Sequence, residues 1–215
     1  MANLHNYHGR YCEAEFESTF LSYLEEAGWS YLAGSSLPRD SMRDVLYTDD
    51  MEFFLNRTNP DLTADEIQQI MDTVRLAGSE SDFATLHKVY DWMVNGIQFT
   101  PQAALPRMVN LIEFEDPEKN VFRAVNQFTV AYTNNGQTQT RRPDILLFVN
   151  GMPLCIIELK NPADKNATIY DAWEQINIRY WRDIPHLLHY CPLACISDGV
   201  KTRLGTVRTP YEHFY

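Results

Sequence analysis

The sequence predicts an α/β protein, with helices packed on a sheet, and three observations lead to this. Segments with apolar residues at helical spacing fill the first half, and segments rich in β-branched and aromatic residues fill the second. Within the second half, two strand-like runs precede a helix and a further strand. The 215 residues are 45% hydrophobic, which suits one packed domain. We therefore expect a single domain over residues 1–215, mainly helical over 1–100, with its sheet-containing core over 105–207.

The first half contains four predicted helices. Apolar residues at helical spacing mark residues 13–27, where Gly28 is a stop signal, and similar apolar content marks 44–56 and 82–94. Thr63 and Glu66 have the spacing of a capping box, in which each side chain accepts a hydrogen bond from the main chain of the other residue. A helix is therefore expected to begin at Thr63.

The second half reads as strands with one long helix. Strands are predicted over 109–114 and 122–133, and the polar stretch NNGQTQT (134–140) is interpreted as a turn or loop. Two apolar runs then flank Asn150-Gly151, a dipeptide typical of tight hairpins. A helix over 168–182 and a strand over 193–196 complete the expected sheet and its cover.

Composition excludes several classes of function. A net charge of −11 argues against a protein that coats nucleic acid, although local contact with DNA stays possible. The opening residues MANLHNYHGRYCEAEF contain no apolar run of signal-peptide length, and the sequence shows no membrane-spanning apolar run and no P-loop, GxGxxG, GxSxG or HExxH motif. We therefore expect a cytoplasmic location with no membrane partner and reduced cysteines. The spacing of His186, His189, Cys191 and Cys195 matches no zinc motif, so core packing is the simpler interpretation.

The stretch RPDILLFVNGMPLCIIELKNP (142–162) carries charge at the ends of apolar strands. A single charged residue at such a position is usually just exposed to solvent at the end of a strand. Here, however, Glu158 and Lys160 are two residues apart and therefore share one face of a strand with Ile156. Charge on one side of an apolar strand is costly unless it is paired or bound to a cation. Carboxylates with a nearby lysine could hold Mg²⁺ and support phosphodiester cleavage.

The hairpin register tests this idea. An ideal two-residue turn at Asn150-Gly151 would pair Asp144 with Ile157 and place Asp144 and Glu158 on opposite faces. One extra residue, in the loop or as a β-bulge, pairs Asp144 with Glu158 instead. Pro153 favours such an irregularity because it cannot donate to the ladder. We predict the bulge.

These residues resemble the PD-(D/E)XK nuclease motif, with Pro143-Asp144 as its first half and the sequence ELK (158–160) as its second. The longer run RRPDILLFVNGMPLCIIELKNP, followed by a helix, RDIPHLLHY and ISDG, is similar to the amino-terminal nuclease domain of the restriction (R) subunit of type I restriction-modification enzymes. Gly28-Trp29 after an acidic helix, and NVFRAVNQFTV, fit the same family. The similarity is densest over 109–205.

The resemblance implies a restriction-endonuclease-like fold, a central mixed sheet flanked by helices, with double-stranded DNA as substrate and Mg²⁺ as cofactor. Asp144 and Glu158 would hold the ion together with the carbonyl of Leu159. Lys160 would orient or activate the attacking water and offset negative charge in the transition state.

Members of such families also take a glutamate from the first helix, and counting back from Gly28-Trp29 makes Glu17 the better match and Glu13 the runner-up. The resemblance further implies modification and specificity subunits as partners, and an ATP-driven motor in domains beyond Tyr215. We expect the chain to be a truncated part of such a subunit, with a stand-alone relative as the other possibility.

One departure from the family concerns its Gln-x-x-x-Tyr motif, because Gln175 and Tyr180 are five residues apart here. At roughly 100° per residue, a separation of four is about 40° from alignment and a separation of five about 140°. Either Ile176 takes the glutamine position, or Arg179 takes the tyrosine position, or a π-bulge brings both Gln175 and Tyr180 to the site.

Two alternatives to a restriction endonuclease stay open at this point. The chain could be a catalytically inactive docking module with the same fold, which the altered Gln/Tyr spacing favours and the intact acids and lysine oppose. It could also be a PD-(D/E)XK nuclease of a repair or mobile-element system, although the sequences flanking the motif argue against this.

Overall fold

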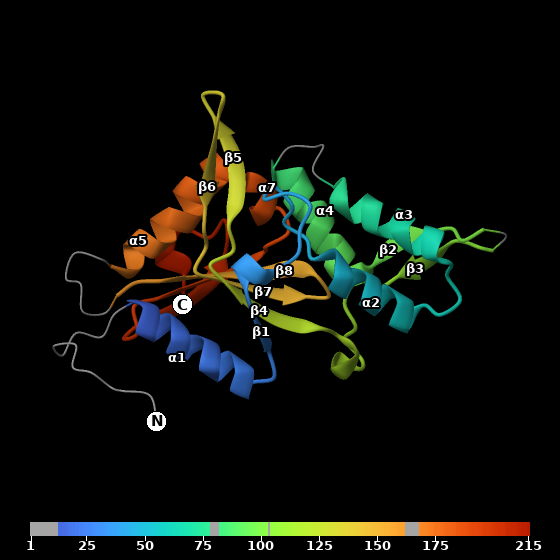
Figure 1. Cartoon of the computed structure of the whole chain (residues 1–215), viewed down its shortest axis with the longest axis horizontal. Coiled ribbons are helices and arrows are strands. Elements are labelled where there is room, and N and C mark those ends of the chain that lie inside the picture. Colours follow the sequence, from blue (N-terminus) through green and yellow to red (C-terminus); the bar gives the residue numbers. More distant parts are fainter. Residues whose placement is uncertain (1–12, 78–81, 103, 162–167) are drawn as a thin grey trace.

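The computed structural model of the chain describes residues 13–77, 82–102, 104–161 and 168–215. Its centre is a mixed six-stranded sheet in the order β1-β4-β7-β8-β9-β10 (Figure 1). The strands of this sheet are β1 (Ser30–Ala33), β4 (Phe122–Asn126), β7 (Ile145–Val149), β8 (Met152–Leu159), β9 (Leu193–Ser197) and β10 (Thr202–Thr206). Two pairs, β1 with β4 and β8 with β9, are parallel, and the others are antiparallel. The predicted α/β class is confirmed.

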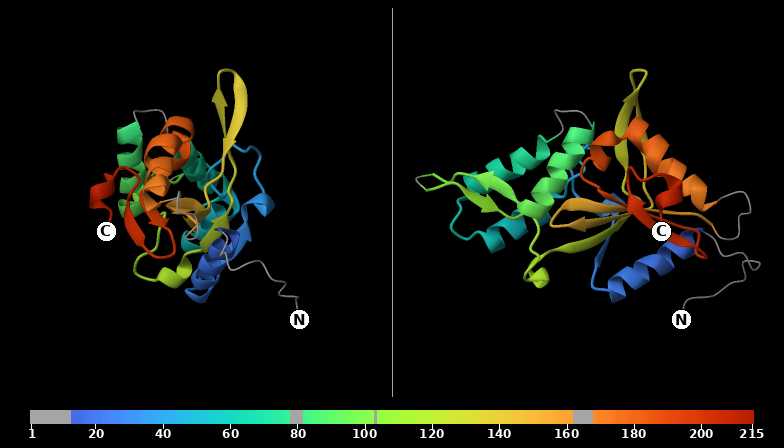
Figure 2. Two further views of the ribbon diagram at one scale, coloured as in Figure 1. Left: turned by 90° about the vertical axis from the view of Figure 1, so that its left-hand side faces the viewer. Right: turned by 180° about the vertical axis from the view of Figure 1, so that it is seen from behind.

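Helices cover both faces of this sheet (Figures 1 and 2). One face packs on α1 (Glu13–Glu26), and the other packs on α5 (Ile169–Glu174) and the helical turns that follow it. Those turns are a π-helix (Gln175–Tyr180), α6 (Trp181–Asp183) and α7 (Pro185–Leu188). To one side lie α2 (Thr48–Thr58), α3 (Ala64–Arg75) and α4 (Asp82–Asn95), next to the small sheet of β2 (Ile97–Phe99) and β3 (Arg107–Val109). Short 3₁₀ turns occur at Gly34–Ser36, Pro117–Lys119 and Tyr211–His213.

The first helix ends as its sequence predicts. Gly28 adopts a left-handed φ of 95°. Its N–H donates to the carbonyl of Glu25 (3.0 Å), and the N–H of Trp29 donates to the carbonyl of Leu24 (2.9 Å). This pair of bonds is a Schellman motif, which satisfies carbonyls at the helix end and needs a residue that tolerates positive φ. It turns the chain directly into β1.

The capping box at Thr63 is present, so the predicted start of α3 is confirmed. The prediction for 44–56 is wrong at its start, because α2 begins only at Thr48. The preceding residue, Tyr47, is extended, and its N–H donates to the carbonyl of Gly151 (2.8 Å) in the β7–β8 turn. A tertiary hydrogen bond therefore holds this segment out of the helix.

Three strand predictions need correction. The segment 122–133 is not one strand: it breaks after β4, where Gln127 has a φ of 51°, and resumes as β5 (Val130–Asn134). The stretch NNGQTQT is a turn only at Asn135-Gly136, because Gln137–Arg141 forms strand β6 and pairs with β5. The strand expected over 109–114 stops at Val109. Beyond it, the Nδ2 of Asn150 donates a hydrogen bond to the carbonyl of Leu111 (2.9 Å).

The β5–β6 hairpin stands clear of the body of the molecule in every view (Figures 1 and 2). Residues 133–140 at its outer end are exposed, whereas Val130, Ala131 and Tyr132 at its base are buried. Within the described stretches, none of the helices has the length and apolar character needed to cross a membrane.

Candidate active site at the end of the β7–β8 hairpin

The β7–β8 hairpin contains the predicted bulge. Its turn is Asn150-Gly151, with φ values of 50° and 78°, and Phe148 pairs with Pro153 as an ideal two-residue turn requires. The register then shifts, so that Leu147 pairs with Cys155 and Leu154 is the extra residue. Beyond the shift Ile145 pairs with Ile157, and the same register places Asp144 opposite Glu158.

The side chains at the end of β8 alternate between the two faces of the sheet, as expected. Ile157 and Leu159 pack with Leu21 in the core under α1, whereas Ile156 joins the core under α5. Glu158 projects to the same side as Ile156, and it is fully buried. A buried carboxyl group in this position needs polar partners.

Those partners come from the π-helix. The Nε2 of Gln175 donates to Glu158 Oε2 (2.6 Å), and the hydroxyl of Tyr180 donates to Glu158 Oε1 (2.8 Å). Gln175 Nε2 also lies 2.7 Å from the Tyr180 hydroxyl. The wider i→i+5 turn brings both side chains to one carboxyl group, so the π-bulge is the correct one of the three possibilities. Ile176 is buried in the core and Arg179 is exposed to solvent.

Lys160 and Asp144 complete the cluster. The Lys160 ammonium donates to Gln175 Oε1 (3.0 Å), which orients the amide so that its Nε2 faces Glu158. Asp144 is partly buried, and its Oδ2 accepts the N–H of Leu159 (2.8 Å). The structure thus brings together all five residues predicted to be catalytic, with the main chain of Leu159 beside them.

Burial and mutual repulsion govern the charge of the two acids. Burial raises the pKa of Glu158 well above its ordinary value, and the neighbouring Asp144 carboxyl raises it further, against the opposing effect of Lys160. Burial also raises the pKa of Asp144, opposed by the Leu159 N–H and by Lys160. In the cation-free protein the pair therefore holds a proton more readily than two solvated carboxyl groups would.

Glu17 lies on α1 next to this cluster without joining it. Its two carboxylate oxygens accept hydrogen bonds from Asn126 Nδ2 (2.6 Å) and Gln127 Nε2 (2.5 Å). The N–H of Gln127 in turn donates to the main-chain carbonyl of Asp144 (2.8 Å). Glu17 is thus two hydrogen-bonded steps from Asp144, and its role as a ligand stays a prediction. The side chain of the alternative, Glu13, lies outside the described residues.

The sequence matches the family model for the type I restriction enzyme R protein N terminus over residues 10–213. The chain belongs to this family. It is 32% identical over 209 residues to the putative type I restriction enzyme MjaIXP endonuclease subunit of Methanocaldococcus jannaschii, which covers 93% of this chain and 20% of that protein. It is 30% identical over 216 residues to the type I restriction enzyme HindI endonuclease subunit of Haemophilus influenzae, covering 94% of this chain and 20% of that protein.

The chain therefore spans about a fifth of the length of these two endonuclease subunits. Its resemblance to the amino-terminal part of a type I R protein, inferred above from RRPDILLFVNGMPLCIIELKNP and the flanking words, is confirmed.

The donor set in this R-protein domain suits a hard divalent cation. Asp144 and Glu158 offer carboxylate oxygens on adjacent strands, and Leu159 offers a main-chain carbonyl. Across the described ranges, no three His, Cys, Asp or Glu side chains gather closely enough to hold a metal ion together. Mg²⁺ commonly binds through one or two carboxylates and keeps several waters, so two acids are sufficient for it. A cation would also relieve the repulsion that raises the pKa of Glu158.

Sequence reasoning missed the surroundings of this site. A hollow of about 210 Å³ joins Gln175 and Tyr180 to the base of the β5–β6 hairpin. Its other lining residues are Thr140, Arg141, Arg142 and Arg179. The doubled arginine in RRPD was a usable signal, because Arg142 lies only two residues before Asp144 and favours its ionised form.

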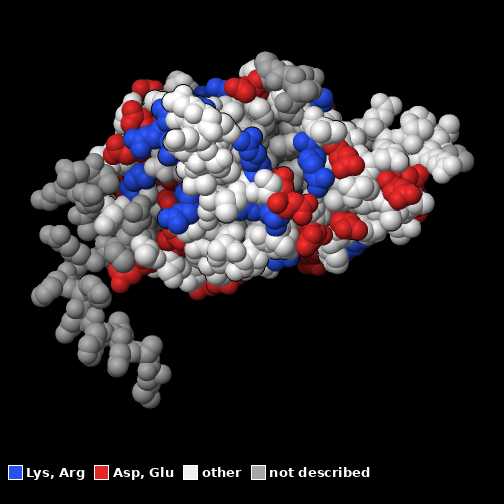
Figure 3. Space-filling model, turned by 45° about the horizontal axis from the view of Figure 1, so that its top comes forward, with Lys and Arg blue, Asp and Glu red and all other residues white. Residues whose placement is uncertain are grey.

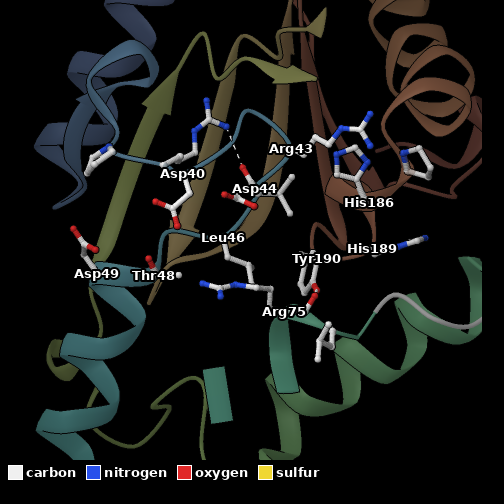
Figure 4. A pocket seen from close by; sticks show the side chains of 15 residues that line it. Asp40, Arg43, Asp44, Leu46, Thr48, Asp49, Arg75, His186, His189 and Tyr190 are labelled. Carbon is white, nitrogen blue, oxygen red and sulfur yellow. Dashed lines mark hydrogen bonds between the residues drawn. The ribbon is translucent and has the colours of Figure 1, made fainter. Parts of the chain in front are cut away.

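A larger hollow, of about 770 Å³, lies between the loop before α2 and the segment around α7 (Figure 4). His186 and His189 line it, and His189 Nε2 lies 2.9 Å from Asp82 Oδ1. Cys191 and Cys195 are instead buried in the two separate cores of the domain. The HxxHxCxxxC residues thus separate into different environments, and Cys12 lies outside the described residues.

Proposed function

We propose that this chain is the Mg²⁺-dependent DNA endonuclease domain of a type I restriction R subunit. The observation that carries the proposal is the convergence on Glu158. Asp144 lies opposite Glu158 in the hairpin register, Gln175 and Tyr180 hydrogen-bond its two oxygens, and Lys160 is held by Gln175. Carboxylates beside an ammonium group are the groups that phosphodiester hydrolysis with a divalent cation requires.

Each side chain has a separate task in this proposal. Asp144 and Glu158, with the Leu159 carbonyl, would hold Mg²⁺. When bound, the ion would supply a Lewis acid that polarises the scissile phosphate. Tyr180 would hold the Glu158 carboxylate in place through its hydroxyl.

Lys160 would orient the attacking water and offset the negative charge that develops on the phosphate oxygens. Gln175 would keep the ammonium group of Lys160 in position, because its amide already joins Lys160 to Glu158. Loss of Gln175 should therefore reduce cleavage less than loss of Lys160.

The wider system is also part of the proposal. Double-stranded DNA would be the substrate, modification and specificity subunits the partners, and the cytoplasm the location. ATP would act only through motor domains that lie outside this chain. Such a motor would deliver DNA to a domain whose net charge of −11 gives it little general affinity for nucleic acid.

The altered spacing of Gln175 and Tyr180 was the observation that favoured an inactive docking module. Because the π-helix brings both residues to Glu158, that spacing no longer counts against catalysis. Membership of the R-protein family likewise supports a restriction system over a repair or mobile-element nuclease.

The decisive experiment is DNA cleavage by the complete R subunit with its partner subunits and ATP, in Mg²⁺ and in EDTA. Lys160→Ala should abolish cleavage while leaving ATP hydrolysis intact. Lys201→Ala provides the control, since Lys201 is an exposed lysine beyond the end of β9. Equal cleavage by wild type and Lys160→Ala would remove Lys160 from the mechanism.

A second experiment measures Mg²⁺ binding to the 215-residue chain by calorimetry. Glu158→Gln keeps the size of the side chain and removes one anionic donor, so it should weaken binding at least tenfold. If wild type and variant bind Mg²⁺ equally, the ion site lies elsewhere. A wild-type chain that neither binds Mg²⁺ nor cleaves DNA within the complex would support the inactive module.

A further inference from the structure

The β5–β6 hairpin is built like a DNA-contacting element. Its outer residues, 133–140, are exposed and read TNNGQTQT, which are uncharged side chains rich in hydrogen-bonding groups. Strands exposed on both faces contribute little to a core, so stability of the domain does not explain why this hairpin is extended. Asn, Gln and Thr are side chains that proteins use to contact base edges and phosphates.

The hairpin is surrounded by positive charge in an otherwise acidic protein. Figure 3 shows Lys and Arg side chains gathered around the uncharged hairpin, on the side of the molecule from which it projects. The arginines nearest the candidate active site are Arg141, Arg142 and Arg179, which line the hollow beside Gln175 and Tyr180. On the other side, Arg43 donates to the Thr133 hydroxyl.

Two of these arginines are available for a ligand. Arg141 is committed to Asp183, with its guanidinium nitrogens 2.6 Å and 2.7 Å from Asp183 Oδ2. Arg142 and Arg179 are exposed, and neither forms a salt bridge with an acid in the part of the chain that the structure describes. Both face the hollow that leads to Gln175 and Tyr180, so an anion bound there would lie next to the catalytic cluster.

We propose that the β5–β6 hairpin enters the major groove of double-stranded DNA while Arg142 and Arg179 contact the backbone phosphates beside the scissile bond. This inference rests on the proposed nuclease function and names how that site takes its substrate. It gives the acidic domain a local surface that is complementary in charge to DNA.

The dimensions of the hairpin suit this groove. Its exposed part includes residues 137–140 of β6, and at about 3.3 Å per residue these extend about 13 Å from the buried base. Its two strands lie about 4.8 Å apart. A two-stranded ribbon fits the major groove of B-DNA, which is about 12 Å wide and about 8.5 Å deep, whereas the minor groove is only about 6 Å wide.

The strand alternation links the hairpin to the phosphate contacts. Thr138 and Thr140 share one face of β6, and Arg142 follows just past the end of the strand, where it lines the hollow together with Thr140. A duplex placed against this face would meet hydroxyl groups along the hairpin and a guanidinium group at its base. Arg179, from the π-helix, also lines the hollow and would contact the same backbone.

The test is binding of a fluorescent 30-base-pair duplex to the 215-residue chain, measured by anisotropy in EDTA so that no cleavage occurs. Removing one phosphate contact should reduce the slope of log affinity against log salt by about 1. Between 50 and 200 mM salt, each contact accounts for about a 3.5-fold loss of affinity. Arg142→Gln and Arg179→Gln should each show that change, and the double variant should show twice the change in slope.

The hairpin itself is tested by changes of charge at an exposed position. Thr138→Lys should tighten binding and steepen the salt dependence, a gain that misfolding cannot produce, and Thr138→Glu should weaken binding. Gln98→Lys and Gln98→Glu are the matched controls, because Gln98 is an exposed strand residue in the separate β2–β3 hairpin. They should leave binding unchanged.

Four results would overturn the inference: no binding by the wild-type chain, unchanged salt slopes in the arginine variants, equal effects at Thr138 and Gln98, or binding to single-stranded DNA as tight as to the duplex. Displacement by a minor-groove ligand such as netropsin, but not by the major-groove ligand methyl green, would also overturn it. Because the assay contains no Mg²⁺, its outcome is separate from that of the cleavage experiment with Lys160→Ala.

Discussion

Deletion of a single residue, Ile178, provides a sharp test of how the π-helix forms the candidate site. Gln175 and Tyr180 are five residues apart and reach the same carboxyl group only because the turn between them is widened. Without Ile178 the separation becomes four, the spacing of the family motif. A regular α-helix should then place the two side chains where the π-helix places them now.

The magnitude follows from the helix geometry. Five residues at about 100° each leave two side chains about 140° apart in a regular helix, and four residues leave them about 40° apart. Ile178 is 49% exposed, so its removal forfeits about 1 kcal/mol of burial at most. Residues on either side of the deletion keep their present faces, because the widened turn is removed together with the extra residue.

A matched deletion in a regular helix should behave differently. Gln69 is an exposed residue of α3, and its deletion rotates everything downstream by about 100°. Ile70, Met71 and Val74 are at most 4% exposed and would leave the core. At about 1.5–3 kcal/mol for each side chain, the loss approaches the whole stability of a typical domain.

Urea unfolding followed by far-UV circular dichroism compares the two deletions, and cleavage by the complete subunit follows for the variant that folds. We expect the Ile178 deletion to unfold within about 1 kcal/mol of wild type and to keep its cleavage activity, while the Gln69 deletion is unfolded. If the two deletions are equally damaging, the π-helix is not a removable one-residue insertion and the reasoning is wrong.

Three further predictions concern single substitutions. Tyr180→Phe should lower the free energy of unfolding in urea by about 1–3 kcal/mol, because a buried oxygen of Glu158 loses its hydrogen-bond donor. The hydroxyl of Tyr132 donates to Gln139 on the exposed hairpin, so Tyr132→Phe should lower it less. The raised pKa of Glu158 stabilises the folded protein below the unfolded-state pKa of about 4.3, and this contribution is lost as pH rises through the higher folded-state value. Glu158→Gln should therefore gain stability relative to wild type in EDTA as pH rises above the unfolded-state pKa of glutamate, and parallel pH profiles would contradict the assignment. Asn150→Ala removes three hydrogen bonds, with Val121, Leu111 and Asn120, of which the last two are buried, and should lower the free energy of unfolding by about 3 kcal/mol.

The features that the sequence predicted well are those set by local chemistry. Gly28 ends α1 because its backbone tolerates positive φ, and Thr63 starts α3 because its hydroxyl and the Glu66 carboxylate satisfy main-chain N–H groups. The β-bulge could also be predicted, because a burial requirement at Asp144 and Glu158 conflicted with the register of a two-residue turn.

The features that it missed are set by contacts far along the chain or by solvent. β1 is a short strand whose pairing with β4 joins residues about 90 positions apart. β6 has no apolar alternation, because the hairpin that it forms stands in solvent and packs on nothing at its outer end. The delayed start of α2 depends on the carbonyl of Gly151. Periodicity cannot reveal strands and helix ends of this kind.

The candidate site depends on two irregularities of one residue each, in different elements. The extra residue Leu154 in β8 brings Asp144 opposite Glu158, and the extra residue in the π-helix brings Tyr180 to the same carboxyl group as Gln175. A regular strand or a regular helix would each have turned one of these side chains to the wrong face. Both irregularities converge on Glu158, a fully buried acid that adds nothing to an apolar core. Proteins depart from regular structure mainly at functional sites, and for this reason the conflict between sequence rules at 144–158 and 175–180 was itself the best signal of where the candidate site lies.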